Sequence, residues 1–307
     1  MTLGRPLSTN GPGAPNAMKV QKTLGLVVIG YRSDEVWEPF LDSLRSSTIT
    51  PAAIVVVENS PAVSPALRSF PDLPITVVHR SDNPGYGAAA NAGVAALNPD
   101  MAHIVICNPD VTVHPTALAM LLSTLETDVH TGTVGPRLLT TRGEVYPSAR
   151  AIPGIRIGIG HALLGNMWPT NPWSHKYLGD YERMEPHSVG WLSGAFLLVR
   201  RAAFDAVGGF DEGYFMFFED VDLGFRLKRC GFRSIYVPAA DVTHSGAHAT
   251  QSDMPAMISA HHRSAARFLS VLYPRKRHIF LRAVLTLGLK TRSLIESRLA
   301  HNRDNKI

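Results

Sequence analysis

Two short polar stretches of the sequence contain the residues best suited to chemistry. The first is Asn108-Pro109-Asp110, which directly follows an apolar run. Oxygen ligands this close together suit a hard divalent cation, Mg²⁺ or Mn²⁺, that bridges the phosphates of a nucleotide diphosphate. One protein carboxylate suffices when phosphates and waters fill the other positions. The alternative is that the tripeptide only makes a turn, as an isolated Asn-Pro-Asp usually does.

The second stretch is Glu219-Asp220-Val221-Asp222, at the expected start of a helix. Acidic residues are favoured there in any case, and Asp222 is four residues from Arg226, so a surface ion pair is the alternative for that residue. The acids also follow an aromatic run at residues 214–218, which could wall off a pocket and raise a carboxylate pKa. A carboxylate placed in this way could act as a general base toward an attacking hydroxyl.

Histidines gather in the last third of the chain, at His244, His248 and His261-His262. There is no H-E-x-x-H pattern and no third ligand at metalloprotease spacing, so a zinc hydrolase is not indicated. One of these histidines could still share a metal with Asp110, and the others are expected to be ordinary polar residues. The sequence also lacks a G-x-G-x-x-G fingerprint, a G-x-S-x-G elbow and a Walker loop.

The elements that must position these residues read as an α/β fold with a largely parallel sheet. Residues 24–29, 53–57, 75–79 and 103–107 are apolar runs of strand length, as expected for a sheet covered on both faces. Helices are predicted after residue 36, within residues 83–93 and over residues 219–230, and residues 191–200 predict one further strand. Polar residues follow each of the first four strands, where ligands bind in such sheets. They are Tyr31-Arg32-Ser33, Glu58-Asn59-Ser60, Asp82-Asn83 and Asn108-Pro109-Asp110.

Composition limits the class of protein. The 307 residues are 45% hydrophobic and 18% charged, which excludes a wholly disordered chain. Two cysteines, Cys107 and Cys230, are too few for a disulfide framework and indicate a reducing compartment. No run of eighteen apolar residues predicts a transmembrane helix, and the first twenty residues lack the apolar core of a secretion signal.

The positive charge is concentrated at one end of the chain. Residues 272–307 hold nine Lys and Arg against two acids, whereas the rest of the chain has 21 basic and 23 acidic residues. This distribution argues against a nucleic-acid partner and for a local anionic one. Phe280, Val284 and Leu287 share a helical face, joined by Leu281 and Leu285, and basic residues surround it. Such a helix is typical of one that lies on an anionic membrane, the alternative being a terminal helix packed on the core.

Taken in order, these elements resemble the inverting family-2 glycosyltransferases of GT-A fold, over about residues 23–270. The most specific part is residues 191–232, and NPGYGAAANAG (83–93) and CNPDV (107–111) are similar to the nucleotide side of the family. The segments EVYPSAR (144–150), HALLGNMWPTNPW (161–173) and VGWLSG (189–194) resemble the family's actinobacterial rhamnosyltransferases, which act on decaprenyl-diphospho-N-acetylglucosamine.

The resemblance implies a role for each matching residue. Asp110 would be the main metal ligand, with Asn108 in place of the family's first Asp and His244 joining the metal shell. Asp220 would be the catalytic base with Glu219 beside it, and Glu58 stands where the family usually has an Asp that contacts the nucleoside. The implied nucleotide-sugar contacts are Tyr31, Glu58, Asn59, Asn83, Gly85 and Asn91, and the implied acceptor contacts are Trp191, Ser193 and Gly194.

The resemblance further implies transfer of L-rhamnose from dTDP-β-L-rhamnose to polyprenyl-diphospho-GlcNAc by a metal-assisted inverting displacement. We expect a flexible tail (1–20), a catalytic domain (21–245, with a nucleotide half at 21–112 and an acceptor half at 113–245) and a basic helical segment (246–307). That segment would hold the enzyme peripherally at the cytoplasmic face of the plasma membrane, on the anionic inner leaflet. A homodimer is compatible with the sequence.

Three alternatives stay open. The first is the same fold with another sugar donor or another acceptor. The second is a sugar-1-phosphate nucleotidylyltransferase, which would need a Gly-rich basic loop after the first strand that residues 30–33 do not supply. The third is a non-catalytic cell-wall scaffold, and the presence of Asp110, Asp220 and His244 together argues against it.

Overall fold

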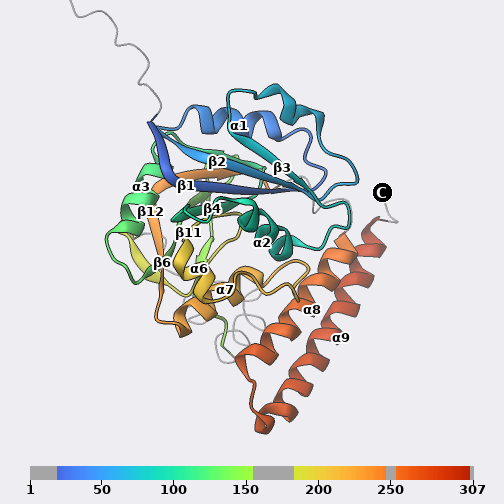
Figure 1. The fold of residues 1–307 in the computed structure, drawn as a ribbon. Coiled ribbons are helices and arrows are strands. Elements are labelled where there is room, and N and C mark those ends of the chain that lie inside the picture. The colour runs from blue at the N-terminus through green and yellow to red at the C-terminus, as the bar shows by residue number, and fades with distance from the viewer. Residues whose placement is uncertain (1–18, 155–182, 247–253, 305–307) are drawn as a thin grey trace, which may run out of the picture.

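The computed structural model describes residues 19–154, 183–246 and 254–304, which form one large sheet, a two-stranded sheet and the helices that surround them (Figure 1). The strands are β1 (Lys19–Gly30), β2 (Ile49–Glu58), β3 (Ile75–His79), β4 (His103–Cys107), β5 (Val111–Val113), β6 (Thr131–Leu139), β7 (Val145–Tyr146), β8 (Ala149–Arg150), β9 (His187–Val189), β10 (Trp191–Leu192), β11 (Phe196–Arg200) and β12 (Arg233–His244). The helices are α1 (Trp37–Arg45), α2 (Tyr86–Ala96), α3 (Ala117–Glu126), α6 (Arg201–Ala206), α7 (Glu219–Arg229), α8 (Met254–Leu272) and α9 (Ile279–Asp304), with 3₁₀ turns η1 (Pro65–Ser69) and η2 (Lys276–His278).

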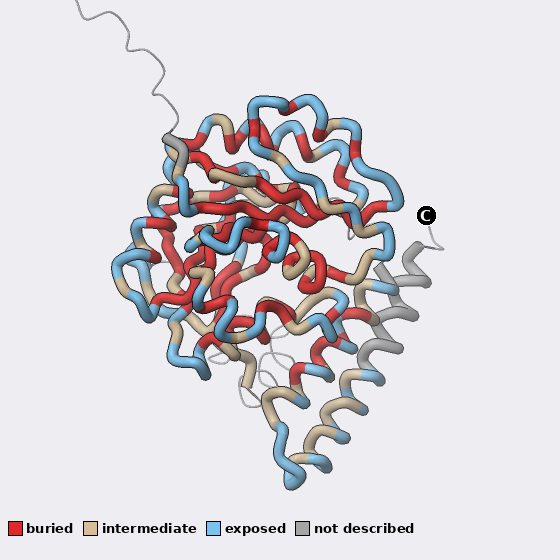
Figure 2. The backbone as a smooth tube through the Cα atoms, in the orientation of Figure 1, coloured by how far each residue is buried: buried red, intermediate tan, exposed pale blue. Residues whose placement is uncertain are grey.

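Apolar residues of successive strand positions are buried on opposite faces of the large sheet. Leu26 and Val28 of β1 pack on the side of α1, η1 and α3, whereas Val27 and Ile29 pack on the side of α2, α6 and α7. Figure 1 shows α1 on one side of the sheet and α2 and α7 on the other, and Figure 2 shows the central strands buried over most of their length. Continuous apolar strands are therefore explained by helices on both faces.

The strand order is β3-β2-β1-β4-β11-β6-β12-β5. The first four strands are parallel, as the alternation of strands and helices predicts. Beyond β4 the sheet is mixed, because β11 runs antiparallel to both β4 and β6, and β5 runs antiparallel to β12. This second half brings the residues after β4 next to the end of β12.

Most of the predicted elements are confirmed, with two corrections. Residues 75–79 form a strand, but it is β3 at the edge of the sheet and is largely exposed, rather than buried like its neighbours. Residues 191–200 do not form one strand. They form β10 in the two-stranded sheet and β11 in the large sheet, separated by a turn at residues 193–195. Backbone N–H groups of that turn bond elsewhere, so the ladder cannot continue through it.

The C-terminal helices lie side by side as a hairpin whose connecting turn projects away from the sheet (Figure 1). Buried residues occur on α8, and Figure 2 shows them next to the body of the protein. On α9, Leu281 and Leu285 are half-buried, whereas Phe280, Val284 and Leu287 are exposed. The five residues predicted to share one apolar face therefore divide into a half-buried pair and an exposed set of three. Among the helices in the described ranges, none is long and apolar enough to cross a membrane.

Gly93 on α2 packs directly against the sheet. A Cβ at this position would lie 2.3 Å from Val27 Cγ1 and 2.8 Å from Val57 Cγ2. We expect Gly93→Ala to lower the free energy of unfolding by about 1–3 kcal/mol, because the extra carbon forces apart a packed core. Gly288→Ala on α9 is the matched control, since no atom lies within 4 Å of its would-be Cβ. The control should be about 0.5–1 kcal/mol more stable than the wild type in urea unfolding, and equal effects at the two sites would contradict this packing.

Candidate active site

Asp110 and His244 come from neighbouring strands and lie in contact. Asp110 follows β4 and leads into β5, and His244 ends β12, which pairs with β5 so that His244 lies opposite Val111. His244 Nε2 is 3.2 Å from Asp110 Oδ1 and 3.5 Å from Asn108 Nδ2. The fold therefore brings together the three residues that the sequence assigns to a metal.

The Asp110 carboxylate is kept ionised although it is largely buried. Burial by itself would raise the pKa of Asp110, but the contact with His244 and backbone N–H groups outweigh burial, and the net shift of the pKa is downward. Across the described residues, no three His, Cys, Asp or Glu side chains cluster closely enough to hold a metal. A cation bound by Asp110 and His244 would therefore need further oxygen ligands from phosphates or water.

Asp220 and Glu219 occupy the first turn of α7, where the helix dipole favours negative charge. Asp220 accepts hydrogen bonds from two backbone amides, Gly194 N to Oδ2 at 3.0 Å and Val221 N to Oδ1 at 2.8 Å. Burial nevertheless raises the pKa of Asp220, against the effect of these amides and of the Arg150 charge. Burial, followed by the charge of Asp220, raises the pKa of Glu219 to about 8. These shifts have the direction that the sequence predicts.

The turn at residues 193–195 connects the two acidic centres. The Ala195 carbonyl accepts a hydrogen bond from Asn108 N at 3.0 Å, and Gly194 N donates to Asp220. Tyr86 of α2 donates its hydroxyl to the Gly194 carbonyl at 2.5 Å. Burial raises the pKa of Tyr86, and the neighbouring acidic groups, Asp220 and Asp110 among them, raise it further. Asp220 and the segment that contains Asp110, far apart in the sequence, are therefore both connected by hydrogen bonds to the 193–195 turn, and Tyr86 is bonded to the same turn.

The predicted nucleotide side lies at the ends of β1 and β2. Glu58 is fully buried, with Oε1 accepting from Ser60 N at 3.1 Å. Within the described part of the chain, Glu58 Oε2 and the adjacent Asn59 Oδ1 have no hydrogen-bond partner. The residues at the end of β1 are hydrogen-bonded to those at the end of β2, because Asn59 N donates to the Gly30 carbonyl and Arg32 N donates to Ser60 Oγ. Two buried acceptors without a donor are unusual and suit a ligand that brings N–H or O–H groups.

Tyr31, Asn83 and Gly85 lie in loops that follow the carboxyl-terminal ends of strands, Tyr31 after β1 and the other two after β3. The Arg32 guanidinium lies over the Tyr31 ring at 5.3 Å from its centre. Asn83 and Gly85 have positive φ angles, of 41° and 98°. Gly85 is required for a local reason, because a Cβ there would lie 2.3 Å from the Phe215 carbonyl oxygen.

Asn91 is not grouped with the other predicted sugar contacts. Its Oδ1 accepts from Phe210 N at 2.9 Å, and its Nδ2 donates to the Phe210 carbonyl at 2.9 Å and to Glu212 at 3.0 Å. With both ends of the amide engaged in this way, Asn91 fixes the loop that precedes α7 against α2.

On the predicted acceptor side, Trp191 of β10 is paired with Arg150 of β8. The Arg150 guanidinium lies 5.6 Å from the centre of the Trp191 ring, and the indole N–H donates to the Ala151 carbonyl at 3.1 Å. Ser193 N donates to the Ser148 carbonyl at 2.8 Å. Sequence reasoning gave Arg150 and Tyr86 no role, although the motif EVYPSAR contains the arginine.

The remaining candidates are distributed as follows. Asp222 pairs with Arg226 at 2.6 Å as the helical spacing predicts, but its side chain is only 1% exposed, so this is an ion pair with a buried carboxylate and a half-buried arginine rather than a surface pair. His261 and His262 lie on α8, where His261 contacts the Phe217 and Phe218 rings. His248 and the segment 161–173 lie outside the described residues.

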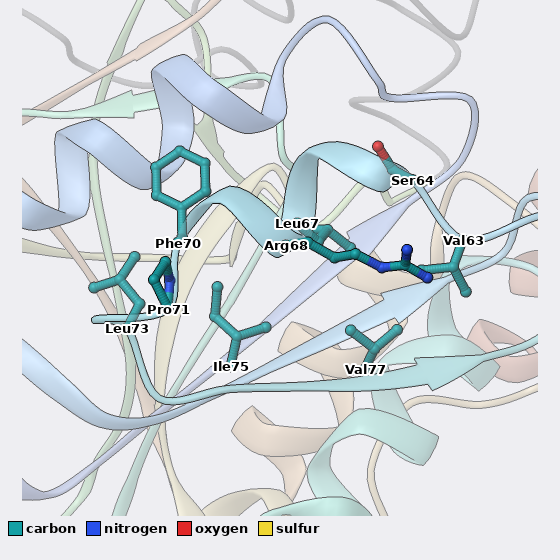
Figure 3. Close-up of a pocket in the computed structure, with 9 residues that line it drawn as sticks. All are labelled: Val63, Ser64, Leu67, Arg68, Phe70, Pro71, Leu73, Ile75 and Val77. Atoms are coloured by element: carbon teal, nitrogen blue, oxygen red, sulfur yellow. The ribbon is translucent and has the colours of Figure 1, made fainter.

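Figure 3 shows a pocket of about 320 Å³ between η1 and β3. Its lining is mostly apolar, including Leu67, Phe70 and Ile75, and Arg68 is its one charged residue. The pocket contains no carboxylate that could bind a cation or accept a proton. The acidic centre around the 193–195 turn is therefore the better candidate for chemistry.

Comparison with known proteins gives consistent matches. Residues 22–266 match the family model described as glycosyltransferase-like family 2. The chain is 38% identical over 301 residues to N-acetylglucosaminyl-diphospho-decaprenol L-rhamnosyltransferase of Mycobacterium tuberculosis, covering 92% of this chain and 96% of that protein. It is 43% identical over 82 residues to rhamnosyltransferase WbbL of Escherichia coli, covering 27% of this chain and 31% of that one.

Solved structures match at the level of the fold. Mannosyltransferase PcManGT of Pyrobaculum calidifontis, in complex with GDP-Man and Mn²⁺, has a TM-score of 0.54 at 14% identity and covers 94% of this chain and 79% of its own. GalNAc-T7 with UDP, GalNAc and Mn²⁺ has a TM-score of 0.53 at 15% identity, covering 72% of this chain and 43% of its own. The expected GT-A fold is confirmed.

The raised pKa of Glu219 predicts a stability that depends on pH. A carboxyl group whose pKa is higher in the folded chain stabilises the fold at low pH, and this contribution is lost as pH rises through about 8. Glu219→Gln removes the ionisation. The free energy of unfolding of the variant, relative to that of the wild type, should therefore be higher at pH 9 than at pH 5 by up to a few kcal/mol. Urea unfolding at both pH values measures the gain, and a difference that does not change with pH would contradict the shift.

Proposed function

Because this chain belongs to glycosyltransferase-like family 2 and is a glycosyltransferase, we propose that it transfers L-rhamnose from dTDP-β-L-rhamnose to decaprenyl-diphospho-GlcNAc. The sugar would be added to the 3-hydroxyl of GlcNAc, forming the unit that links arabinogalactan to peptidoglycan. The observation that carries the proposal is the arrangement of Asp110 and Asp220 around the 193–195 turn. Identity to the mycobacterial rhamnosyltransferase over nearly the whole of both chains supports this donor and acceptor.

Asp220 is the proposed general base. Its carboxylate takes the proton from the GlcNAc 3-hydroxyl while that oxygen attacks the anomeric carbon, and the bond from that carbon to the diphosphate breaks on the opposite face. Two backbone amides hold the carboxylate in place, and burial raises its pKa and so its basicity. Glu219, with its pKa of about 8, is mostly protonated at neutral pH, whereas the Asp220 carboxylate accepts the two amide hydrogen bonds.

Asp110, His244 and Asn108 are the proposed holders of a divalent cation, Mg²⁺ or Mn²⁺. The buried, ionised carboxylate beside an imidazole fits such an ion, and the diphosphate of the donor would supply the oxygens that the protein lacks. When bound, the cation neutralises the charge that develops on the departing diphosphate. Manganese in the complexes of two structures with this fold supports a divalent cation.

Glu58 and Asn59 are the proposed contacts for the nucleoside. Their buried and unpartnered oxygens can accept N–H groups from a pyrimidine ring, and Tyr31 lies next to them at the end of β1. Asn83 and Gly85, in the loop between β3 and α2, are proposed to contact the nucleotide sugar from the same end of the strands. Trp191, Ser193 and Gly194 are proposed to face the acceptor sugar, because they form the strand end and the turn on which Asp220 is held.

A transfer assay tests the proposal. Purified protein with a short-chain polyprenyl-diphospho-GlcNAc and a panel of nucleotide sugars should transfer rhamnose from dTDP-rhamnose and lose this activity in a chelator. Asp220→Asn should lower kcat at least about a hundredfold because the base is removed, while dTDP binding stays near the wild-type value. Asp205→Asn, an exposed acid on α6, is the matched control. Transfer from another nucleotide sugar in preference would overturn the donor, and loss of dTDP binding in Asp220→Asn would indicate a structural role.

We propose that the C-terminal hairpin holds the enzyme on the anionic inner leaflet, where the lipid acceptor lies. The exposed side chains Phe280, Val284 and Leu287 recur along α9 at helical spacing. Residues 275–291 contain six basic residues counting His278 and no acid. Apolar side chains on one face with cations around them are the pattern of an interfacial helix. A homodimer stays a prediction.

Binding to vesicles that contain phosphatidylglycerol tests this surface. The double substitution Phe280→Ser and Leu287→Ser should weaken binding at least about tenfold, because two exposed apolar side chains no longer enter the lipid. The matched control is Val129→Ser, which removes an apolar side chain that is 71% exposed elsewhere on the body. Deleting residues 274–307 should abolish binding, and vesicle binding that survives the deletion would refute the role of the hairpin.

A further inference from the structure

The residues that immediately precede Glu219 and Asp220 have an unfavourable backbone conformation. Phe217 and Phe218 have φ angles of 67° and 66°, and Phe218 is the residue from which α7 begins. The left-handed region is disfavoured for residues with a Cβ, and two bulky residues in succession are unusual. Such a turn persists only where the surrounding structure holds it. What holds it also fixes the direction in which the two carboxylates point.

Helix α8, which is distant in the sequence, makes the contacts that hold this turn in place. The Ser264 hydroxyl, which is buried, donates to the Met216 carbonyl at 2.7 Å. The Phe218 ring packs against Phe268 at 5.7 Å and against His261 at 5.4 Å between ring centres. Helix α8 thus contacts both the carbonyl that precedes the strained residues and the rings of Phe217 and Phe218 themselves.

A second set of contacts fixes the start of the same loop. Arg267 of α8 donates to both carboxylate oxygens of Asp211, with a shortest distance of 2.7 Å, and its guanidinium lies 5.2 Å from the centre of the Tyr214 ring. Gly213 leaves room for this arginine, since a Cβ there would lie 2.0 Å from the guanidinium carbon. The loop from residue 211 to residue 218 is therefore attached to α8 at both ends.

From these contacts we propose that α8 is part of the catalytic apparatus, with Ser264 as a positioning residue that sets the orientation of Glu219 and Asp220 by fixing the Met216 carbonyl. The inference rests on the proposed function in one respect, the assignment of Asp220 as the base. In this arrangement α8 connects the hairpin proposed to lie on the membrane to the loop that carries the two carboxylates. Ser264 touches neither substrate in this role, and its effect passes through the turn.

The test compares two serines of the same helix. Ser264→Ala loses the bond to Met216, whereas Ser270→Ala loses only a bond to the Ala266 carbonyl of its own helix and is the control. In Ser264→Ala we expect kcat to fall about tenfold with the donor KM unchanged, because the base is displaced. The acid limb of the kcat–pH profile should move to lower pH, since a looser turn admits water and relieves the burial that raises the carboxylate pKa. Amide hydrogen exchange should become faster in the peptide covering residues 214–222.

A third variant separates positioning from general stability. Glycine adopts positive φ without strain, so adding Phe217→Gly to Ser264→Ala should restore part of kcat. A lower melting temperature in Ser264→Ala, with a kcat and a pH profile equal to those of the wild type, would overturn the proposal. If the wild type itself fails to transfer rhamnose, the proposed function fails, and hydrogen exchange still decides this inference: unchanged exchange at residues 214–222 would refute it.

Discussion

The site depends on the backbone of a three-residue turn. At residues 193–195 the chain leaves the two-stranded sheet and enters the large one, and the amide and carbonyl groups freed by that change bond to two other parts of the chain. The Ala195 carbonyl holds the residue after β4, and the Gly194 amide holds Asp220. The turn contributes a backbone group to each bond, so its own part of the geometry does not depend on a side-chain rotamer. A displacement of this turn would change the position of Asp220 relative to Asn108 and Asp110.

The buried acids around this turn are each stabilised in a different way. Removing several carboxylates from water is costly unless each has a partner or keeps its proton. Asp110 has His244 and backbone amides, and Asp222 has Arg226. Asp220 has two amides, and Glu219, which has an oxygen without a partner in the described residues, has a pKa raised toward the protonated form. The pKa values of these neighbouring carboxyl groups are therefore shifted in different directions, down for Asp110 and up for Asp220 and Glu219, as the proposed division between cation binding and proton transfer requires.

The sequence predicts the parts of this arrangement that have a local cause. Continuous apolar runs gave four strands, and acids followed by basic residues gave α7, because burial and the helix dipole act within a few residues. It could not predict where β3 lies in the sheet or that residues 191–200 divide between two sheets, since both follow from pairing with distant strands. The stacking of Arg150 on Trp191 and the use of Asn91 to fix a loop were missed for the same reason. Helical periodicity likewise predicts one apolar face on α9 and cannot say which of its residues α8 covers.

The hairpin illustrates how one supersecondary unit can satisfy two constraints. The face of α8 toward the body carries Ser264 and Phe268, which are buried against the loop before α7. On α9 the apolar side chains of Phe280, Val284 and Leu287 are exposed, and so is Lys290 further along the helix. If the acceptor is the proposed polyprenyl lipid, its tail stays in the bilayer, so its sugar can reach only a limited height above the lipid surface. On the proposed membrane role, the hairpin would set that height, because α8 packs on the loop before α7 while α9 presents apolar side chains on its outer face.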